Sequence, residues 1–147
     1  MIIEEFKSQT ELNECLLWWQ ARLQLTDWII TARKVSKHEL DNPDDQGECL
    51  MIHSRKVAEI LILNREDLPQ DSVVNTALRY CEEEVLVHEL LHLIYNWMQP
   101  PTTYEAIYLD EMEHQLLDTM ARSLIMVKYN LDLSYFKKPI ESIPTEG

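Results

Sequence analysis

The chain has 147 residues and a formal net charge of −13, which predicts one domain with an acidic surface. Such a surface repels the phosphate backbones of DNA and RNA, so nucleic-acid binding is not expected. Only 2 residues are glycine, which disfavours a glycine-cradled phosphate site. Hydrophobic residues make up 46% of the chain, enough for a sizeable core, but no run of about 18 apolar residues exists that would span a membrane.

Cysteine usage and the first residues both favour the cytoplasm. Cys15, Cys49 and Cys81 are irregularly spaced, a pattern that fits neither a disulfide framework nor a cysteine-rich zinc site. Reduced thiols of this kind are typical of a cytosolic protein. Residues 1–5 lack a basic region followed by an apolar core, so no secretory signal is predicted.

The first half of the chain predicts one helix and three strands. Ser8 and Glu11 have the spacing of a capping box, and apolar residues then recur at helical spacing, which predicts a helix over about 9–25. Stretches rich in β-branched and aromatic residues predict strands at 28–35, 49–53 and 57–63. The short connection between the last two favours an antiparallel hairpin.

The second half predicts two long helices. Residues 73–97 have helical periodicity up to a Pro-Pro pair that ends the helix. A second helix is predicted over about 103–129, again opened by a capping box. The acidic run at 82–84 is interpreted as a solvated face turned towards a basic substrate. Residues 131–147 contain two prolines and predict an irregular tail on the surface.

The stretch His88-Glu89-Leu90-Leu91-His92 carries residues suited to metal chemistry. Residues four apart share one face of a helix, so His88 and His92 can present two imidazoles to one zinc ion. Glu89 can reach a water at that ion without displacing it and act as a general base. The rest of this helix is apolar, and a buried helix carries such polar groups only when they are paired or ligating. The pattern therefore favours a zinc site over an exposed polar patch.

The third ligand is expected on the following helix. A catalytic zinc normally takes three protein ligands and keeps one position for water. His114 and Glu113 are both candidates, and because they are adjacent the phase of the helix decides between them. We favour His114, since Asp118 lies one turn away and can orient its imidazole. Glu113 remains the alternative ligand.

A predicted sheet, then a Val-His-Glu-Leu-Leu-His helix, then a helix with Glu-His-Gln-Leu-Leu-Asp-Thr-Met-Ala, resembles a minimal zincin metallopeptidase of phage or phage-derived type. The ImmA/IrrE-type peptidases are more distantly similar. The resemblance spans about residues 20–127 and implies an α+β fold with an N-terminal helix, a small three-stranded, mostly antiparallel sheet and two long helices that carry the metal site. In such proteins the third ligand is often Glu. His92 is not followed by the Gly-x-x-His extension of metzincins.

The resemblance implies zinc-dependent hydrolysis of peptide bonds in a protein or peptide substrate, with Glu89 as the general base. A free strand edge, expected at residues 57–63, would pair with the substrate backbone. Tyr95, Tyr104 and Tyr108 are candidate donors to the oxyanion. The alternative is a non-catalytic zinc-binding module, a phage-type regulator that binds a protein partner. Glu89 favours the enzyme, because a structural metal has no need of a carboxylate at that position.

Overall fold

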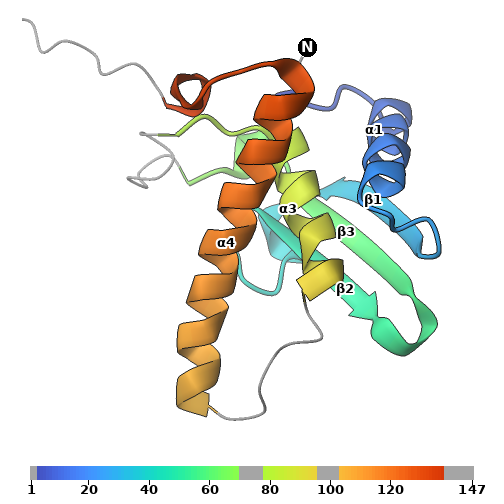
Figure 1. The fold of residues 1–147 in the computed structure, drawn as a ribbon, viewed down its shortest axis with the longest axis vertical. Coiled ribbons are helices and arrows are strands. Elements are labelled where there is room, and N and C mark those ends of the chain that lie inside the picture. The colour runs from blue at the N-terminus through green and yellow to red at the C-terminus, as the bar shows by residue number, and fades with distance from the viewer. Residues whose placement is uncertain (1–2, 70–77, 96–102, 138–147) are drawn as a thin grey trace, which may run out of the picture.

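Figure 1 shows the fold in a computed structural model, which describes residues 3–69, 78–95 and 103–137, with side chains from residue 111 onward in the last range. The fold is α+β, with an N-terminal helix, a small three-stranded mixed sheet and two further helices. Within the described residues, no helix is both long enough and apolar enough to cross a membrane.

Helix α1 (Gln9–Arg22) begins where the sequence predicts. The hydroxyl of Ser8 accepts a hydrogen bond from the backbone N–H of Glu11 at 3.1 Å, which satisfies one of the free amides of the first turn. The helix ends at Arg22 rather than at about 25, because Gln24 adopts a left-handed backbone conformation with φ of 59°. Leu12, Leu16 and Trp19 are buried in the main core.

The three strands are β1 (Ile29–Val35), β2 (Gly47–Ile52) and β3 (Val57–Leu63), in the order β1-β3-β2. The antiparallel β2–β3 hairpin is confirmed, but β1 runs parallel to β3. The prediction of a mostly antiparallel sheet was therefore wrong. A short turn fixes the direction of β3 against β2, whereas the longer connection after β1 carries the chain past the centre to the opposite edge.

Strand β3 lies at the centre of the sheet and is buried on both faces. Its residues Ile60 and Ile62 face the main core, and Leu61 and Leu63 form a second cluster on the other face. A central strand has both edges paired, so β3 cannot receive an added strand. The free strand edge was expected at residues 57–63, which form β3. The free edge on the side of the sheet nearest the two-histidine helix belongs to β2 instead.

Helix α3 (Glu82–Tyr95) carries the two-histidine motif and is shorter than predicted. Residues 78–81 are not helical, and Leu78 instead forms an antiparallel bridge with Lys137. The remaining parts of the predicted helix, 73–77 and 96–97, lie outside the described residues. Apolar periodicity continues through this boundary, which is why the sequence does not show it.

The N-terminal segment, residues 3–6, caps the start of α3. Backbone carbonyls of the segment accept from the first helical amides, and side-chain carboxylates of the helix accept from amides of the segment. The four bonds are Glu83 N–H to Ile3 O at 3.2 Å, Glu82 N–H to Glu4 O at 3.0 Å, Ile3 N–H to Glu83 Oε2 at 3.1 Å and Phe6 N–H to Glu82 Oε1 at 2.8 Å. A distant part of the chain thus satisfies the free groups of this helix terminus.

Two of the three glutamates that open α3 are fully buried and the third is largely buried, so the interpretation of this run as a solvated face was wrong. Glu82 and Glu83 are each 0% exposed. Glu82 forms an ion pair with Lys34 at 3.0 Å. Glu83 accepts hydrogen bonds from Trp19 and Tyr129 and forms an ion pair with Lys128. Periodicity along one helix does not reveal these partners, which come from other elements.

Helix α4 (Thr103–Tyr129) has the predicted bounds. Leu117, Ala121 and Ile125 are 0% exposed. The apolar residues Leu116 and Val127 are 48% and 82% exposed, because the face of α4 that packs on α3 is narrower than the set of apolar positions along the helix. The predicted cap before residue 103 lies outside the described residues.

The segment after α4 is not an irregular surface tail over its described part. A 3-10 turn at Leu133–Phe136 places the side chain of Phe136 in the core, where it is 1% exposed. Residues 138–147 lie outside the described residues.

Candidate metal centre

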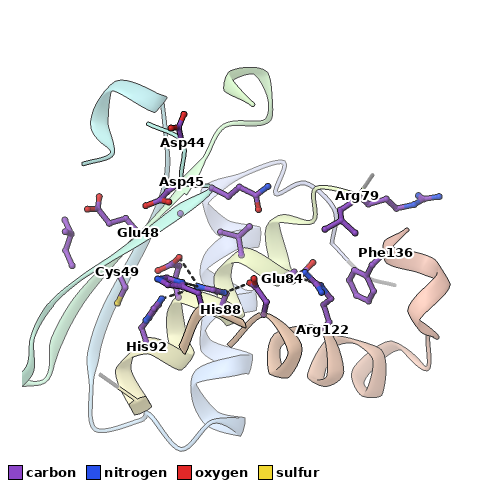
Figure 2. Close-up of a pocket in the computed structure, with 18 of the residues that line it drawn as sticks. Asp44, Asp45, Glu48, Cys49, Arg79, Glu84, His88, His92, Arg122 and Phe136 are labelled. Carbon is purple, nitrogen blue, oxygen red and sulfur yellow. Dashed lines mark hydrogen bonds and ion pairs between the residues drawn. The ribbon is translucent and has the colours of Figure 1, made fainter. Parts of the chain in front are cut away.

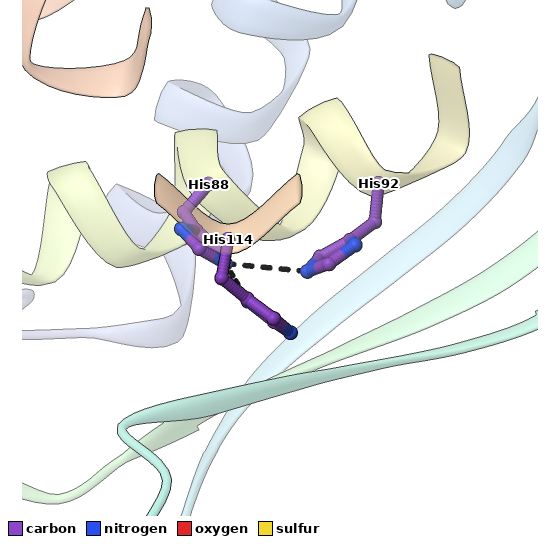
Figure 3. Close-up of side chains that lie close together, drawn as sticks. All are labelled: His88, His92 and His114. Carbon is purple, nitrogen blue, oxygen red and sulfur yellow. Dashed lines mark hydrogen bonds between the residues drawn. The ribbon is translucent and has the colours of Figure 1, made fainter. Parts of the chain in front are cut away.

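The three imidazoles predicted as ligands lie together between α3 and α4 (Figure 3). The Nε2 atom of His88 is 3.2 Å from Nε2 of His92 and 3.3 Å from Nδ1 of His114. One ring nitrogen of each residue lies within 4.8 Å of those of the other two. Tetrahedral zinc with Zn–N bonds of 2.0–2.1 Å separates its ligand nitrogens by roughly 3.3 Å. The spacing therefore fits a zinc ion.

Two carboxylates outside the cluster orient the imidazoles of α3. Asp118 Oδ1 lies 2.7 Å from Nδ1 of His88, and Glu113 Oε1 lies 3.3 Å from Nδ1 of His92. A carboxylate accepts, so we assign the ring proton of each histidine to Nδ1 and the lone pair to Nε2. The two Nε2 lone pairs then face each other at 3.2 Å, an arrangement that a cation between them stabilises. The donor set thus also fits a metal electronically.

The structure separates the two candidates for the third ligand. His114 lies in the imidazole cluster, whereas Glu113 approaches it only through His92. Asp118, predicted to orient His114, holds His88 instead, because its side chain crosses to α3 rather than following its own helix. The orienting role of Glu113 was missed. In the sequence, the only sign of this role is that Glu113 is the residue next to His114.

A further ion pair lies one helical turn from the cluster. Arg122 Nε donates to Glu84 Oε1 at 2.9 Å. Burial raises the pKa of Glu84 to about 7 in spite of the attraction of Arg122. Together with His88–Asp118 and His92–Glu113, this pair joins α3 to α4 by polar contacts on the face that carries the imidazoles.

Glu89 is a buried carboxylate beside the imidazole cluster. It is 6% exposed, and its Oε1 lies 4.0 Å from Nε2 of His88. Its carboxylate makes no hydrogen bond within the part of the chain that the structure describes. Burial, reinforced by the nearby Asp45 and Glu48, raises the pKa of Glu89 to about 7. A carboxylate of that pKa can both accept and release a proton near neutral pH.

The cluster opens into a pocket of about 940 Å³ (Figure 2). Strand β2 and the loop before it form one wall, and helices α3 and α4 form the other. In Figure 2, Asp44 and Glu48 lie on one side of His88, and Arg79 and Arg122 lie on the other. The imidazoles of α3 and α4 therefore face β2 and its loop across the pocket.

The interpretation of the site rests on the geometry of this pocket. No protein-family model, curated protein or solved structure matches the chain. Of the tyrosines predicted as oxyanion donors, Tyr95 donates to Met120 Sδ at 3.4 Å and does not line the pocket. The side chains of Tyr104 and Tyr108 lie outside the described part. The arrangement that remains is three imidazoles with a buried carboxylate at the base of an open pocket.

Gly47 allows β2 to approach α3 closely at this point. A Cβ atom added there would lie 2.7 Å from Val85 Cγ1, 3.0 Å from Leu61 O and 3.2 Å from Glu89 Oε1. We expect Gly47→Ala to lower the free energy of unfolding by about 1–3 kcal/mol, because the added methyl group overpacks this contact. Urea unfolding measures the change, and exposed Ser54→Ala on the same hairpin is the control. Unchanged stability of Gly47→Ala would contradict the close approach.

Proposed function

We propose that the chain is a zinc-dependent metallopeptidase of the zincin type, with His88, His92 and His114 as the zinc ligands. The observation that carries this proposal is the convergence of three imidazole nitrogens, within 4.8 Å of one another, beside a buried carboxylate in an open pocket. Structural zinc sites normally have four protein ligands, whereas catalytic sites have three and an open position. The three-histidine set supports the catalytic class.

The residues of the site have separate roles in hydrolysis. Bound zinc supplies a Lewis acid that acidifies water and polarises a carbonyl group. Glu89 accepts the proton of the attacking water and returns it to the leaving amine. Asp118 and Glu113 keep Nε2 of His88 and of His92 free to ligate. Burial of Glu89 keeps this proton transfer away from bulk water.

Strand β2 is the element that would hold the substrate backbone. It pairs with β3 along one edge, and residues 47–51 line the pocket. An extended peptide can add to such an edge by backbone hydrogen bonds, which places its carbonyl groups along the imidazole cluster. The arrangement of an edge strand beside the two-histidine helix supports the zincin assignment.

The metal content of the purified protein tests this proposal. Elemental mass spectrometry of protein prepared without chelators should find about one zinc per chain. His114→Ala should lose it, because two imidazoles remain. Glu113→Ala should keep it with an affinity lower by about 10–100-fold, as expected for loss of a group that orients a ligand. Full zinc occupancy in His114→Ala would overturn the ligand set.

Turnover is the second part of this test. A mixture of peptides incubated with the zinc-loaded protein should be cleaved, and cleavage should stop when a chelator removes the metal. Zinc binding without cleavage of any peptide would overturn the peptidase and leave a zinc-binding module that contacts a protein partner.

A further inference from the structure

Strand alternation decides which side chains of β2 meet the reactive centre. Gly47 faces α3, because a Cβ atom added there would lie 3.2 Å from Glu89 Oε1. Cys49 and Met51 follow at two-residue spacing, so they lie on the same face of the strand. Both residues pack against the main core and line the pocket. Figure 2 shows Glu48 on the opposite side of β2 from Cys49. The wall that β2 turns towards Glu89 therefore carries no charge.

Cys49 is a neutral, apolar part of this wall. Burial, reinforced by the negative charges of Glu89 and Glu48, raises the pKa of Cys49 to about 12. The thiol therefore stays protonated near neutral pH, and a protonated cysteine behaves as a small hydrophobic residue. Met51 is flexible and can adapt its shape to a neighbouring group. The two side chains form an apolar surface beside the imidazole cluster, and the proposed hydrolysis does not use it.

The backbone of β2 would bring a substrate side chain to this surface. Leu63 N–H donates to Gln46 O at 2.9 Å, so Gln46 directs its carbonyl group towards β3. Backbone directions alternate along an antiparallel strand, so the N–H and C=O groups of Gly47 and Cys49 point away from β3. A peptide that adds at this edge pairs with those groups. Directly opposed residues share a face, so the substrate residue opposite Cys49 places its side chain against Cys49 and Met51.

We propose that Cys49 and Met51 form the subsite that selects the substrate, and that the pocket binds peptides with an apolar side chain such as leucine opposite Cys49. The inference rests on the proposed peptidase function, since it names the substrate class of the same site. A polar side chain is disfavoured there, because a thiol and a thioether are weak hydrogen-bond partners and its desolvation is left uncompensated. The neighbouring residues of an extended peptide point to the other face of the sheet, so this subsite selects one residue.

Binding without turnover tests the inference. Blocked alanine peptides that differ only in a central alanine, leucine, asparagine or glutamate are titrated into zinc-supplemented Glu89→Gln protein by calorimetry. Asparagine has nearly the shape of leucine but carries a polar amide. We expect the leucine peptide to bind at least about tenfold more tightly than the asparagine and alanine peptides, because its branched carbon chain leaves water. The glutamate peptide should bind most weakly. Equal binding of the leucine and asparagine peptides, or no binding of any peptide, would overturn the inference.

Variants on the two faces of β2 separate the subsite from the rest of the strand. Cys49→Ser with Met51→Gln, made in the Glu89→Gln protein, keeps the size of the wall but makes it polar, and should bring the leucine-to-asparagine ratio close to one. Ile52→Thr is the matched control, because Ile52 is 54% exposed on the other face of β2 and does not line the pocket. Circular dichroism checks that each variant folds, and Cys49→Ser alone should lower the ratio if the double variant does not fold. A preserved ratio in the folded variant would contradict the subsite.

The wild-type protein distinguishes this failure from that of the proposed function. If zinc-loaded wild type binds the leucine peptide selectively and cleaves it, both proposals stand. If it cleaves the leucine and asparagine peptides equally well, only the substrate class is overturned. Selective binding without any cleavage would overturn the peptidase while supporting a site for apolar peptides.

Discussion

Replacing Glu89 with glutamine is expected to lower the rate of peptide hydrolysis by at least about 10²-fold and to leave zinc bound. Glutamine has nearly the shape of glutamate but cannot accept a proton from water. The three imidazoles do not depend on Glu89, whose Oε1 lies 4.0 Å from the nearest ring nitrogen of His88. The folded state should be no less stable, because burial disfavours the charge of Glu89 and raises its pKa to about 7 in spite of the attraction of His88.

The measurement combines zinc per chain, by elemental mass spectrometry, with the cleavage rate of a peptide that the wild type hydrolyses. Glu14→Gln, an exposed change on α1, is the matched control and should behave as the wild type. Turnover by Glu89→Gln within a few-fold of the wild type would exclude Glu89 as the general base. Loss of zinc in that variant would instead place Glu89 among the ligands.

Replacing Glu83 with alanine should have the largest effect on stability. Glu83 is 0% exposed and is the common partner of Lys128, Tyr129 and Trp19. Removal of one member of a buried ion pair leaves the other charge uncompensated, which costs about 3–5 kcal/mol. Domains are stable by only about 5–15 kcal/mol, so a large part of the total would be lost. Urea unfolding measures the change, with Glu14→Ala, expected within about 0.5 kcal/mol of wild type, as the control.

The same carboxylate predicts how stability depends on pH. Burial acts to raise the pKa of Glu83, but hydrogen bonds from Lys128, Tyr129 and others outweigh it and hold the pKa below its ordinary value of 4.5. The stabilisation is therefore complete above pH 4.5 and is lost as the pH falls through the folded-state pKa. The stability difference between wild type and Glu83→Gln should shrink below pH 4.5. A difference independent of pH would contradict this account.

The sequence predicted the part of the candidate site that depends on one helix. His88, Glu89 and His92 are related by local spacing, and α3 places the two histidines towards α4 and Glu89 towards β2. The third imidazole depends on how two helices pack, and His114 was favoured for a local reason that the structure does not show. Asp118 holds His88 rather than His114. Contacts across a helix interface are set by packing, which periodicity does not encode.

The same limit explains the other errors. The three glutamates at the start of α3 looked solvated because their partners Lys34, Arg122 and Lys128 are distant in the chain. The direction of β1 relative to β3 depends on where a long connection leads the chain, whereas the β2–β3 hairpin follows from its short turn. Phe136 enters the core although its neighbours have no regular pattern.

The contacts at the start of α3 come from both ends of the described chain, so they are completed in a fixed order during synthesis. Ile3 bonds to Glu83 across a separation of 80 residues, and Tyr135 bonds to Glu4 across 131. Lys128, which neutralises Glu83, also lies beyond all three imidazoles in the chain. A nascent chain that has just released His114 from the ribosome thus has every proposed zinc ligand and the cap formed by residues 3–6, but not yet Lys128 and Tyr129, which hold Glu83. The ligands are synthesised first, and the framework that aligns them is completed by the last residues of α4 and the turn that follows.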